Sequence, residues 1–369
     1  MPAEAAFASF EFGENVFTDK ALRSNRVTLH DVAKRAGCSL ATASRVLNDS
    51  KTVGHEVREK VRKAAESLGY VPNASARALR STETRLVGAV IPTVDHAIYA
   101  VMIHALQQRL GERQISLILS TSMYDTDLEL IQVRQLLERG VEAVVLVGSE
   151  HDPLTLDLIE QRGIPYVLTY TNRPCRSGVP VGFDNEEAGR AAARFLLGLG
   201  HRKLAMIAGI TRHNDRARER VSGFLAELAA QGIAASEVPV HEAPYSVSAG
   251  MAAMRDVLKA SDWPTAVFCA SDILAAGAIK QCTANGIDVP GTISILGFDD
   301  LEVARLTTPE LTTFEVPAAD MGRLAADVLM ASPTQKLHLG NTELFVRMAV
   351  RGSTAPFRES GKEGGRSRD

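Results

Sequence analysis

The sequence predicts a small helix-turn-helix domain followed by a two-lobed α/β core, in which each lobe is a doubly wound parallel sheet. Three observations support this prediction. The length of 369 residues exceeds the usual size of one domain. Residues 26–81 contain short helical patterns around a glycine turn. From Leu86 onward, continuous apolar runs alternate with amphipathic helical patterns, as in parallel sheets covered on both faces.

The composition is that of a globular protein, with 45% hydrophobic and 23% charged residues. The net charge of −3 hides an asymmetry. Between Lys20 and Arg85 there are fourteen Lys or Arg and six Asp or Glu, a net charge of +8, so the rest of the chain carries −11. A basic segment on an acidic body suggests a polyanionic partner for that segment, although a solvated charged face would look the same.

The four cysteines are expected to be free thiols in a reducing cytosol, because none has a metal-ligand or CxxC spacing. Residues 1–25 lack the apolar run of a signal peptide, and we expect them to be a disordered extension, native or from an upstream start. No run is long enough to span a bilayer. The polar, glycine-rich residues 358–369 are expected to be a disordered tail.

The first domain is predicted from helix signals. Thr28 and Asp31 resemble a capping box at the start of the first helix. Gly37 ends this helix and makes the turn, and Ser39 can cap the second helix. A third helix runs from about His55 to Ser67.

The outward side of the second helix carries the side chains expected to meet DNA. Thr42, Ser44 and Arg45 can donate hydrogen bonds to phosphates or base edges, whereas Leu40 and Ala41 offer only apolar contact, for example to a thymine methyl group. An ordinary helical hairpin in a protein core is the alternative, but short helices with small inward and polar outward residues favour DNA.

The stretches VTLHDVAKRAGCS, SRVLN, REKV and LGYVPNASARALRS resemble the amino-terminal domain of LacI-type (lactose/galactose repressor family) transcription regulators. The resemblance implies a hinge helix, here residues 73–84, in which Leu79 enters the minor groove and kinks the DNA. Base preference in the family depends most on the positions of Leu40 and Ala41. The predicted DNA contacts are Thr28, Ser39, Leu40, Ala41, Thr42, Ser44, Arg45, Asn48, Thr52, His55, Asn73, Arg77 and Leu79.

The core is predicted from two series of apolar strands, one from about Leu86 to Gly182 and one from about Asp184 to Phe298. Two parallel sheets imply a ligand site between the lobes, at the carboxyl ends of the strands. The stretches VGFDNEEAG, LGHRKLAMIAG, ISILGFDDL and VRMAVRGST resemble the effector-binding core of the same family, which is related in fold to periplasmic sugar-binding proteins.

These patterns and the resemblance divide the chain into a helix-turn-helix domain (26–72), the hinge (73–84) and the core (85–357). Lobe 1 is expected at about 85–183 and 315–340, and lobe 2 at about 184–314 and 341–357.

Ten residues near strand ends are the candidate effector ligands: His96, Tyr99, Ser149, Thr169, Tyr170, Arg216, Arg220, Tyr245, Ser271 and Asp299. The resemblance implies that Arg220 clamps the effector, that Asp299 accepts hydrogen bonds from it, and that Tyr99 and Tyr245 flank it.

Each of these roles has a structural alternative. Arg220 could pair with acids on its own helix, Asp299 could cap the next helix, and the two tyrosines could simply pack. Arg216 lies one turn before Arg220, and a second cation in the cleft would favour an anionic ligand such as a sugar acid.

The sequence therefore predicts a DNA-binding regulator, a repressor of the LacI type, that binds palindromic operator DNA as a homodimer and responds to a small-molecule effector. No membrane partner, metal or cofactor is expected, and no GxGxxG, Walker, GxSxG or HExxH motif is present. The alternatives are a solute-binding sensor without a DNA role and an enzyme on the same fold.

Overall fold

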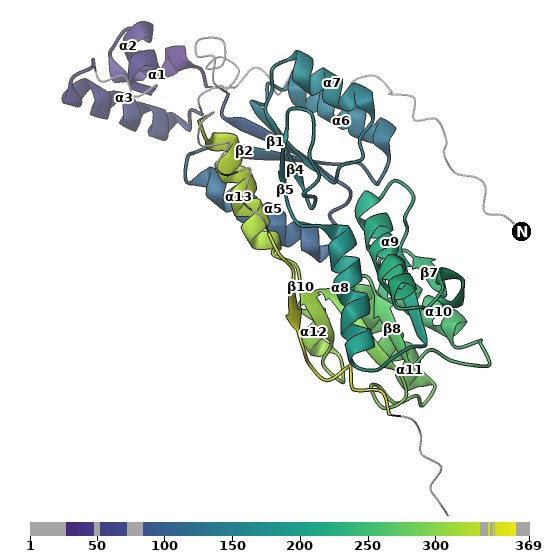
Figure 1. Cartoon of the computed structure of the whole chain (residues 1–369). Helices are drawn as coiled ribbons and strands as arrows, with labels where there is room; N and C mark the ends of the chain where they lie inside the picture. Colours follow the sequence, from purple (N-terminus) through teal and green to yellow (C-terminus); the bar gives the residue numbers. More distant parts are fainter. Residues whose placement is uncertain are drawn as a thin grey trace, which may run out of the picture. The chain divides into compact units, whose positions relative to one another are not determined.

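We describe residues 27–47, 52–71, 84–332, 339, 342 and 344–358 of a computed structural model (Figure 1). The chain forms two compact units, one up to Thr84 and one from Arg85. Among the described residues, no helix is both long and apolar enough to cross a membrane.

The amino-terminal unit consists of α1 (Leu29–Ala36), α2 (Leu40–Leu47) and α3 (His55–Leu68). The predicted capping box at Thr28 is confirmed, because its Oγ1 accepts from the Asp31 N–H while its own N–H donates to the Asp31 carboxylate at 2.8 Å. Gly37 ends α1 and Gly69 ends α3, both in the left-handed conformation.

A small core holds these three helices together. Its buried members are Val32, Ala33, Ala43, Val46, Val61, Ala64 and Ala65. All of them are alanine or valine, so the area removed from water is small and the unit's own stability is modest.

The first lobe has a five-stranded, wholly parallel sheet in the order β2-β1-β3-β4-β5. Its strands are β1 (Leu86–Ile91), β2 (Ser116–Thr121), β3 (Ala143–Val147), β4 (Tyr166–Thr169) and β5 (Val179–Val181). Helices α5 (Ala97–Gly111) and α13 (Ala318–Met330) share one core cluster with this sheet, and α6 (Thr126–Glu138) and α7 (Pro153–Gln161) share another.

The second lobe has a six-stranded sheet in the order β11-β10-β9-β8-β6-β7. Its strands are β6 (Leu204–Gly209), β7 (Val240–Ala243), β8 (Ala266–Cys269), β9 (Ser294–Asp299), β10 (Thr312–Glu315) and β11 (Arg347–Ala349). The sheet is parallel, as predicted, except at one edge, where β11 pairs antiparallel with β10. A returning strand at an edge can pair in this way without a crossover helix.

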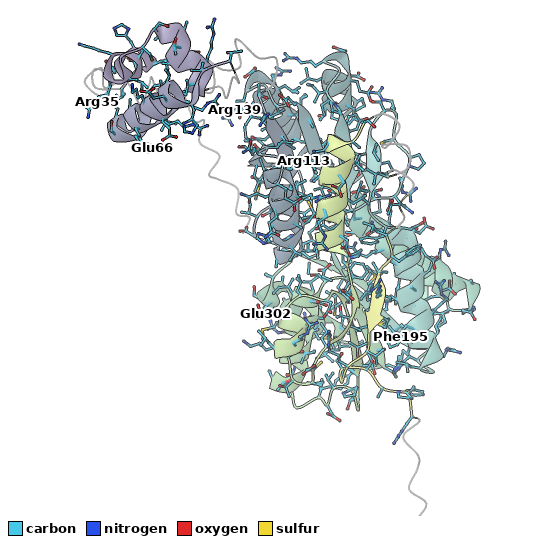
Figure 2. The ribbon with its side chains drawn as sticks, turned by 90° about the vertical axis from the view of Figure 1, so that its left-hand side faces the viewer. Arg35, Glu66, Arg113, Arg139, Phe195 and Glu302 are labelled. Carbon is cyan, nitrogen blue, oxygen red and sulfur yellow. The ribbon has the colours of Figure 1, made fainter. Side chains whose placement is uncertain are left out.

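Four helices cover this sheet: α8 (Asn185–Gly198), α9 (Asp215–Ala230), α10 (Val247–Val257) and α11 (Asp272–Ala284). The remaining elements are the short α12 (Val303–Leu306) and the 3-10 turn η2 (Ala235–Glu237). The chain leaves the second lobe after β10 and returns to it at β11. Between them α13 packs along α5, as both views of the ribbon show (Figures 1 and 2).

Glycines allow α8 and α9 to pack backbone against backbone. A Cβ atom at Gly223 would overlap the Glu186 carbonyl oxygen, and one at Gly189 would overlap the Arg220 carbonyl oxygen. The same device brings α13 onto α5, where a Cβ at Gly322 would overlap the Met102 carbonyl. Because α9 carries both predicted arginines, this contact fixes their position.

Gly223→Ala should therefore lower the free energy of unfolding of the core by about 1–3 kcal/mol, the usual effect of an overpacked contact. The matched control is Gly198→Ala, which adds the same methyl group to α8 where nothing lies within 4 Å. This control should be neutral or stabilising by about 0.5–1 kcal/mol. Urea unfolding of both variants checks the prediction, and equal stability of the two would contradict the packing argument.

Candidate functional site

One face of α2 is exposed and carries residues predicted to meet DNA. Leu40 is 49% exposed, and Ala41 and Arg45 are exposed beside it. Ala41 and Arg45 lie one turn apart on the same side of the helix, and Leu40 is its first residue. The face thus combines apolar contact with one guanidinium, which suits the major groove.

Two other predicted DNA contacts, Thr28 and Ser39, cap the starts of α1 and α2. The Ser39 hydroxyl accepts from the Thr42 N–H at 3.1 Å and lies 2.8 Å from the Thr42 hydroxyl, so it caps α2. Thr28 is held in the capping box. Thr42 and Ser44 are half-buried.

Thr52 and His55 are exposed at the start of α3. The predictions for Asn48, Asn73, Arg77 and Leu79 fall outside the described residues.

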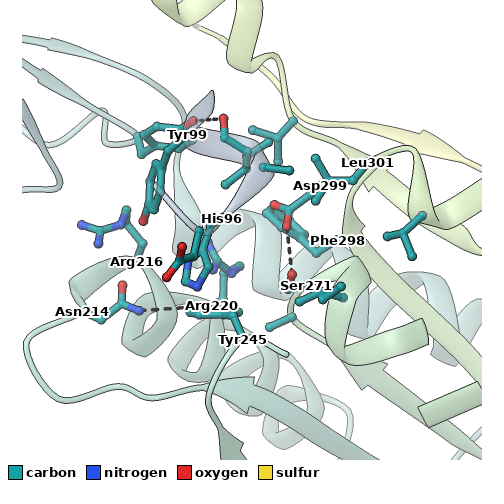
Figure 3. A pocket seen from close by; sticks show the side chains of 18 of the residues that line it. His96, Tyr99, Asn214, Arg216, Arg220, Tyr245, Ser271, Phe298, Asp299 and Leu301 are labelled. Carbon is teal, nitrogen blue, oxygen red and sulfur yellow. Dashed lines mark hydrogen bonds between the residues drawn. The ribbon is translucent and has the colours of Figure 1, made fainter. Parts of the chain in front are cut away.

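A cavity of about 210 Å³ lies between the lobes of the core (Figure 3). Loops that follow the carboxyl ends of strands in both sheets line it, as expected for a doubly wound fold. Eight of the ten predicted ligand residues line this cavity: His96, Tyr99, Tyr170, Arg216, Arg220, Tyr245, Ser271 and Asp299.

Aromatic rings from both lobes form one wall of the cavity. His96 stacks on Tyr99 with 5.9 Å between ring centroids and meets the edge of Tyr245, from the other lobe, at 4.6 Å. Tyr170 packs edge-on against Tyr99 at 5.3 Å. The Tyr124 hydroxyl lies 3.4 Å from the Tyr99 hydroxyl and 3.3 Å from His96 Nδ1. Such a wall favours a ring or the apolar face of a sugar.

Asp299 is the least exposed of the three acids that line the cavity, since Asp95 and Glu302 are exposed. It accepts a hydrogen bond from the Ser271 hydroxyl at 3.1 Å (Figure 3). Its backbone φ of +119° is strained for a residue with a side chain. Residues with such strained backbone angles cluster at functional sites. Burial and the neighbouring Asp272 carboxyl raise the pKa of Asp299 well above its usual range, against the charge of Arg220.

Two predicted ligand residues do not line the cavity, which corrects the sequence interpretation. Thr169 is buried, and its hydroxyl donates to the Leu146 carbonyl at 2.9 Å, within the sheet. The N–H and hydroxyl of Ser149 both donate to one oxygen of Asp215, at 2.6 and 2.8 Å.

Ser149 belongs instead to an inter-lobe clamp, formed by Ser149 and the Val147 carbonyl of the first lobe and by Asp215 and Arg216 of the second. Arg216 Nη1 donates to Asp215 at 2.6 Å and to the Val147 carbonyl at 3.1 Å. Arg216 does line the cavity, as the sequence interpretation expected, but its charge is paired with Asp215. Burial acts to raise the pKa of Asp215, but Arg216 and the Ser149 donors hold it below its usual range.

His151 supports this clamp from the first lobe. Its Nδ1 lies 2.7 Å from a Glu129 carboxylate oxygen and its Nε2 lies 3.1 Å from the Gly148 carbonyl. A carboxylate and a carbonyl both accept, so the two contacts together suit the doubly protonated ring. Burial acts to lower the pKa of His151, but the hydrogen bond and charge of Glu129 raise it above its ordinary value.

Several residues of the site were missed by the sequence interpretation. Tyr124 follows a strand by three residues, so the strand-end rule that found the others could have found it. Phe298 precedes Asp299 and lies beneath Arg220. Asn185 donates to the Tyr170 carbonyl at 2.9 Å and accepts from Arg220 at 2.5 Å. No local sequence pattern indicates these two contacts, because they join residues far apart in the chain.

Two models of known protein families match this chain. Residues 28–73 match bacterial regulatory proteins of the lacI family, and residues 193–354 match a periplasmic binding protein-like domain. The chain is 33% identical over 336 residues to the HTH-type transcriptional regulator GalS of Salmonella typhimurium, which covers 90% of this chain and 98% of GalS.

The chain belongs to the LacI family. This LacI-family protein is a DNA-binding transcriptional regulator, as its exposed α2 and its relatives indicate. Among solved structures, it resembles the lac repressor dimer bound to operator and the anti-inducer ONPF, with a TM-score of 0.79, 26% identity and coverage of 89% of this chain and 99% of that one. It also resembles the CelR–cellobiose complex, with a TM-score of 0.63, 30% identity and coverage of 89% and 100%.

Within the described part of the regulator, no group of three or more His, Cys, Asp or Glu side chains could hold a metal ion.

Asp215→Ala should lower the free energy of unfolding of the regulator's core by about 3–5 kcal/mol, because it leaves the Arg216 guanidinium buried without its partner. Asp256→Ala is the matched control, since it removes an acid whose pair with Lys259 is exposed, and it should change stability little. Thermal unfolding checks both variants. Similar melting temperatures for the two would contradict the clamp.

The stability that His151 contributes should depend on pH. Its folded-state pKa is raised, so its contribution is complete below the unfolded-state pKa of about 6.5 and is lost as pH rises through the folded-state value. The melting temperature of the wild type minus that of His151→Gln should therefore fall as the pH is raised from about 6.5 upward. A difference that stays constant across this range would show that the imidazolium is not the stabilising form.

Proposed function

We propose that this LacI-family regulator is a repressor that binds a palindromic operator as a homodimer, and that a small metabolite in the inter-lobe cavity sets its operator affinity. The observation that carries the proposal is that one chain joins an exposed recognition helix to a cavity lined by two lobes. The effector class is a sugar, a sugar acid or a related metabolite.

Two relatives support this proposal by what they bind. The lac repressor structure is a dimer on operator DNA with a small molecule, and the CelR structure holds cellobiose. A two-fold operator needs two recognition helices about one helical turn apart, which a homodimer supplies.

In the proposed mechanism, the effector biases the arrangement of the two lobes. Tyr245 and Arg220 of the second lobe and His96 of the first line the same cavity, so a bound molecule touches both lobes. The inter-lobe clamp stabilises one arrangement without it. The bound effector shifts operator affinity only by its differential affinity for the two arrangements, typically about 1–3 kcal/mol.

On the DNA side, we assign base contacts to Leu40, Ala41 and Arg45, and phosphate contacts to residues at the start of α3. We keep Leu79 as the minor-groove residue of the hinge. We also propose that the protein works in the bacterial cytoplasm and is not an enzyme, because the relatives reported above are transcriptional regulators.

The experiment that tests this function is operator binding. An operator selected from random duplexes with the full chain should bind with an affinity that falls steeply with salt. Arg45→Ala should weaken operator binding by about 1–3 kcal/mol, about 5- to 150-fold, because it removes a guanidinium that can reach a base edge. Fluorescence anisotropy measures this change.

Arg113→Ala is the matched control, because Arg113 is an exposed arginine of the core (Figure 2). This variant should bind the operator as the wild type does. Unchanged affinity of Arg45→Ala would refute the placement of α2. A chain that binds small molecules but selects no DNA would be a sensor without a DNA role.

A further inference from the structure

A buried ionisable pair, His151 and Glu129, lies next to the inter-lobe clamp. The His151 side chain is 0% exposed, and that of Glu129, on α6, is 10% exposed. His151 Nδ1 lies 2.7 Å from a Glu129 carboxylate oxygen, and Nε2 lies 3.1 Å from the Gly148 carbonyl oxygen. The pair therefore contacts the residues that follow β3, where the first lobe meets Asp215.

The two contacts of the ring hold one proton more than a neutral imidazole beside a carboxylate does. The Gly148 carbonyl can only accept, so His151 Nε2 must carry a hydrogen. The contact between Nδ1 and Glu129 needs a second hydrogen, which either the ring or the carboxyl can carry. When one of these protons is lost, the remaining ring hydrogen goes to the charged carboxylate, because a charge-assisted hydrogen bond is the stronger one. Nε2 and the Gly148 carbonyl then face each other as two acceptors.

The Gly148 carbonyl belongs to the same peptide group as the Ser149 N–H, which donates to Asp215 of the second lobe at 2.6 Å. A peptide group is planar and turns as one unit. His151 holds its carbonyl end, and Asp215 holds its amide end. Because Gly148 has no side chain and a φ of +91°, the backbone can rotate here at little steric cost. A rotation that takes the carbonyl away from His151 therefore also takes the Ser149 N–H away from Asp215.

The other charged and titratable groups on the elements around His151 have partners of their own or are exposed. They belong to its own loop, to α6, and to the start of α9 with the loop before it, and they are Asp125, Glu150, Asp152, His213, Asp215, Arg216 and Arg218. Asp125 and Asp152 cap α6 and α7. Glu150 pairs with Arg218 at 2.8 Å, Asp215 pairs with Arg216 at 2.6 Å, and His213 is exposed. Glu129 is therefore the carboxylate that shares the proton of His151.

We propose that the inter-lobe clamp is a pH-dependent latch, in which the proton shared by His151 and Glu129 fixes the Gly148–Ser149 peptide group on Asp215. The latch is complete while the proton is bound, and the inter-lobe hydrogen bond of Ser149 weakens when the proton leaves. Burial acts to lower the pKa of His151, but Glu129 and the Gly148 carbonyl raise it above its ordinary value, so the latch weakens as pH rises from about 6.5 upward. The consequence for DNA rests on the proposed function, since it requires that the lobe arrangement sets operator affinity.

Hydrogen exchange of the ligand-free full chain tests the latch directly, by mass spectrometry of overlapping peptides. After correction for the chemical exchange rate, the wild-type Ser149 amide should be at least about fivefold less protected at about pH 8.5 than at about pH 6, the equilibrium factor of one lost hydrogen bond. Glu129→Gln is the decisive variant, because its neutral amide can donate to His151 Nδ1 while Nε2–H donates to Gly148. In this variant the Ser149 amide should be equally protected at both pH values.

His213→Asn is the matched control, since it removes an exposed histidine near the clamp, and asparagine suits the left-handed backbone there, with φ +53°. This variant should keep the pH dependence of the wild type. Three results would overturn the proposal: equal protection of the wild-type Ser149 amide at both pH values, a loss in Glu129→Gln as large as that in the wild type, or a pH dependence that disappears in His213→Asn.

A double-mutant cycle separates action through the clamp from stabilisation of the first lobe alone. Asp215→Asn keeps the shape of the side chain but removes the charge that the Ser149 donors bind. At about pH 6, His151→Gln should lower the melting temperature by at least about 2 °C less in the Asp215→Asn background than in the wild type. Equal shifts in the two backgrounds would contradict the latch, because His151 would then stabilise only its own lobe.

Operator binding separates the latch from the proposed function. The ratio of wild-type to Glu129→Gln operator affinity should change by about twofold or more between about pH 6 and about pH 8.5, since the two proteins have the same recognition helix. A constant ratio together with pH-dependent protection of Ser149 would support the latch and count against the proposed function. A changing ratio without any change in Ser149 protection would overturn the latch and leave the proposed function standing.

Discussion

The buried carboxylate of Asp215 is the group on which the geometry between the lobes depends. It stands at the first turn of α9 and binds two donors of Ser149, across the cleft, and the guanidinium of Arg216 beside it. Gly148, with φ +91°, lies directly against this pair, and a Cβ atom there would overlap Arg216. The clamp is therefore built from charge, backbone conformation and the absence of a side chain together.

The clamp pairs Arg216 with Asp215, whereas Arg220 has no ion pair with a described residue and also lines the cavity. Both arginines lie on α9, whose position is set by the glycine contact with α8. One guanidinium holds the two lobes and the other faces the cavity with a free donor. The inter-lobe clamp and the unpartnered donor at the cavity thus lie on neighbouring turns of one helix.

The amino-terminal unit is stabilised in a different way from the core. Its core of alanines and valines is small, and its helix ends are stabilised by local devices, the capping box at Thr28 and the left-handed glycines Gly37 and Gly69. Such local signals can be read directly from sequence, and the three helices and their ends were predicted correctly. Of the predicted outward face of α2, Leu40, Ala41 and Arg45 are exposed, whereas Thr42 and Ser44 are half-buried. The excess of positive charge in this part of the chain fits its DNA partner.

The sequence by itself determined the helix-turn-helix pattern, the alternation of strands and helices in the core, the family and eight of the residues around the cavity. It could do so because strand periodicity, turn residues and strand-end positions are local properties of the chain. Only the tertiary structure decided that Ser149 and Arg216 serve the clamp, that Thr169 bonds within its sheet, and that Asn185 and Phe298 hold Arg220. Those facts depend on contacts between residues far apart in the chain, and one turn of helix separates a paired guanidinium from an unpaired one.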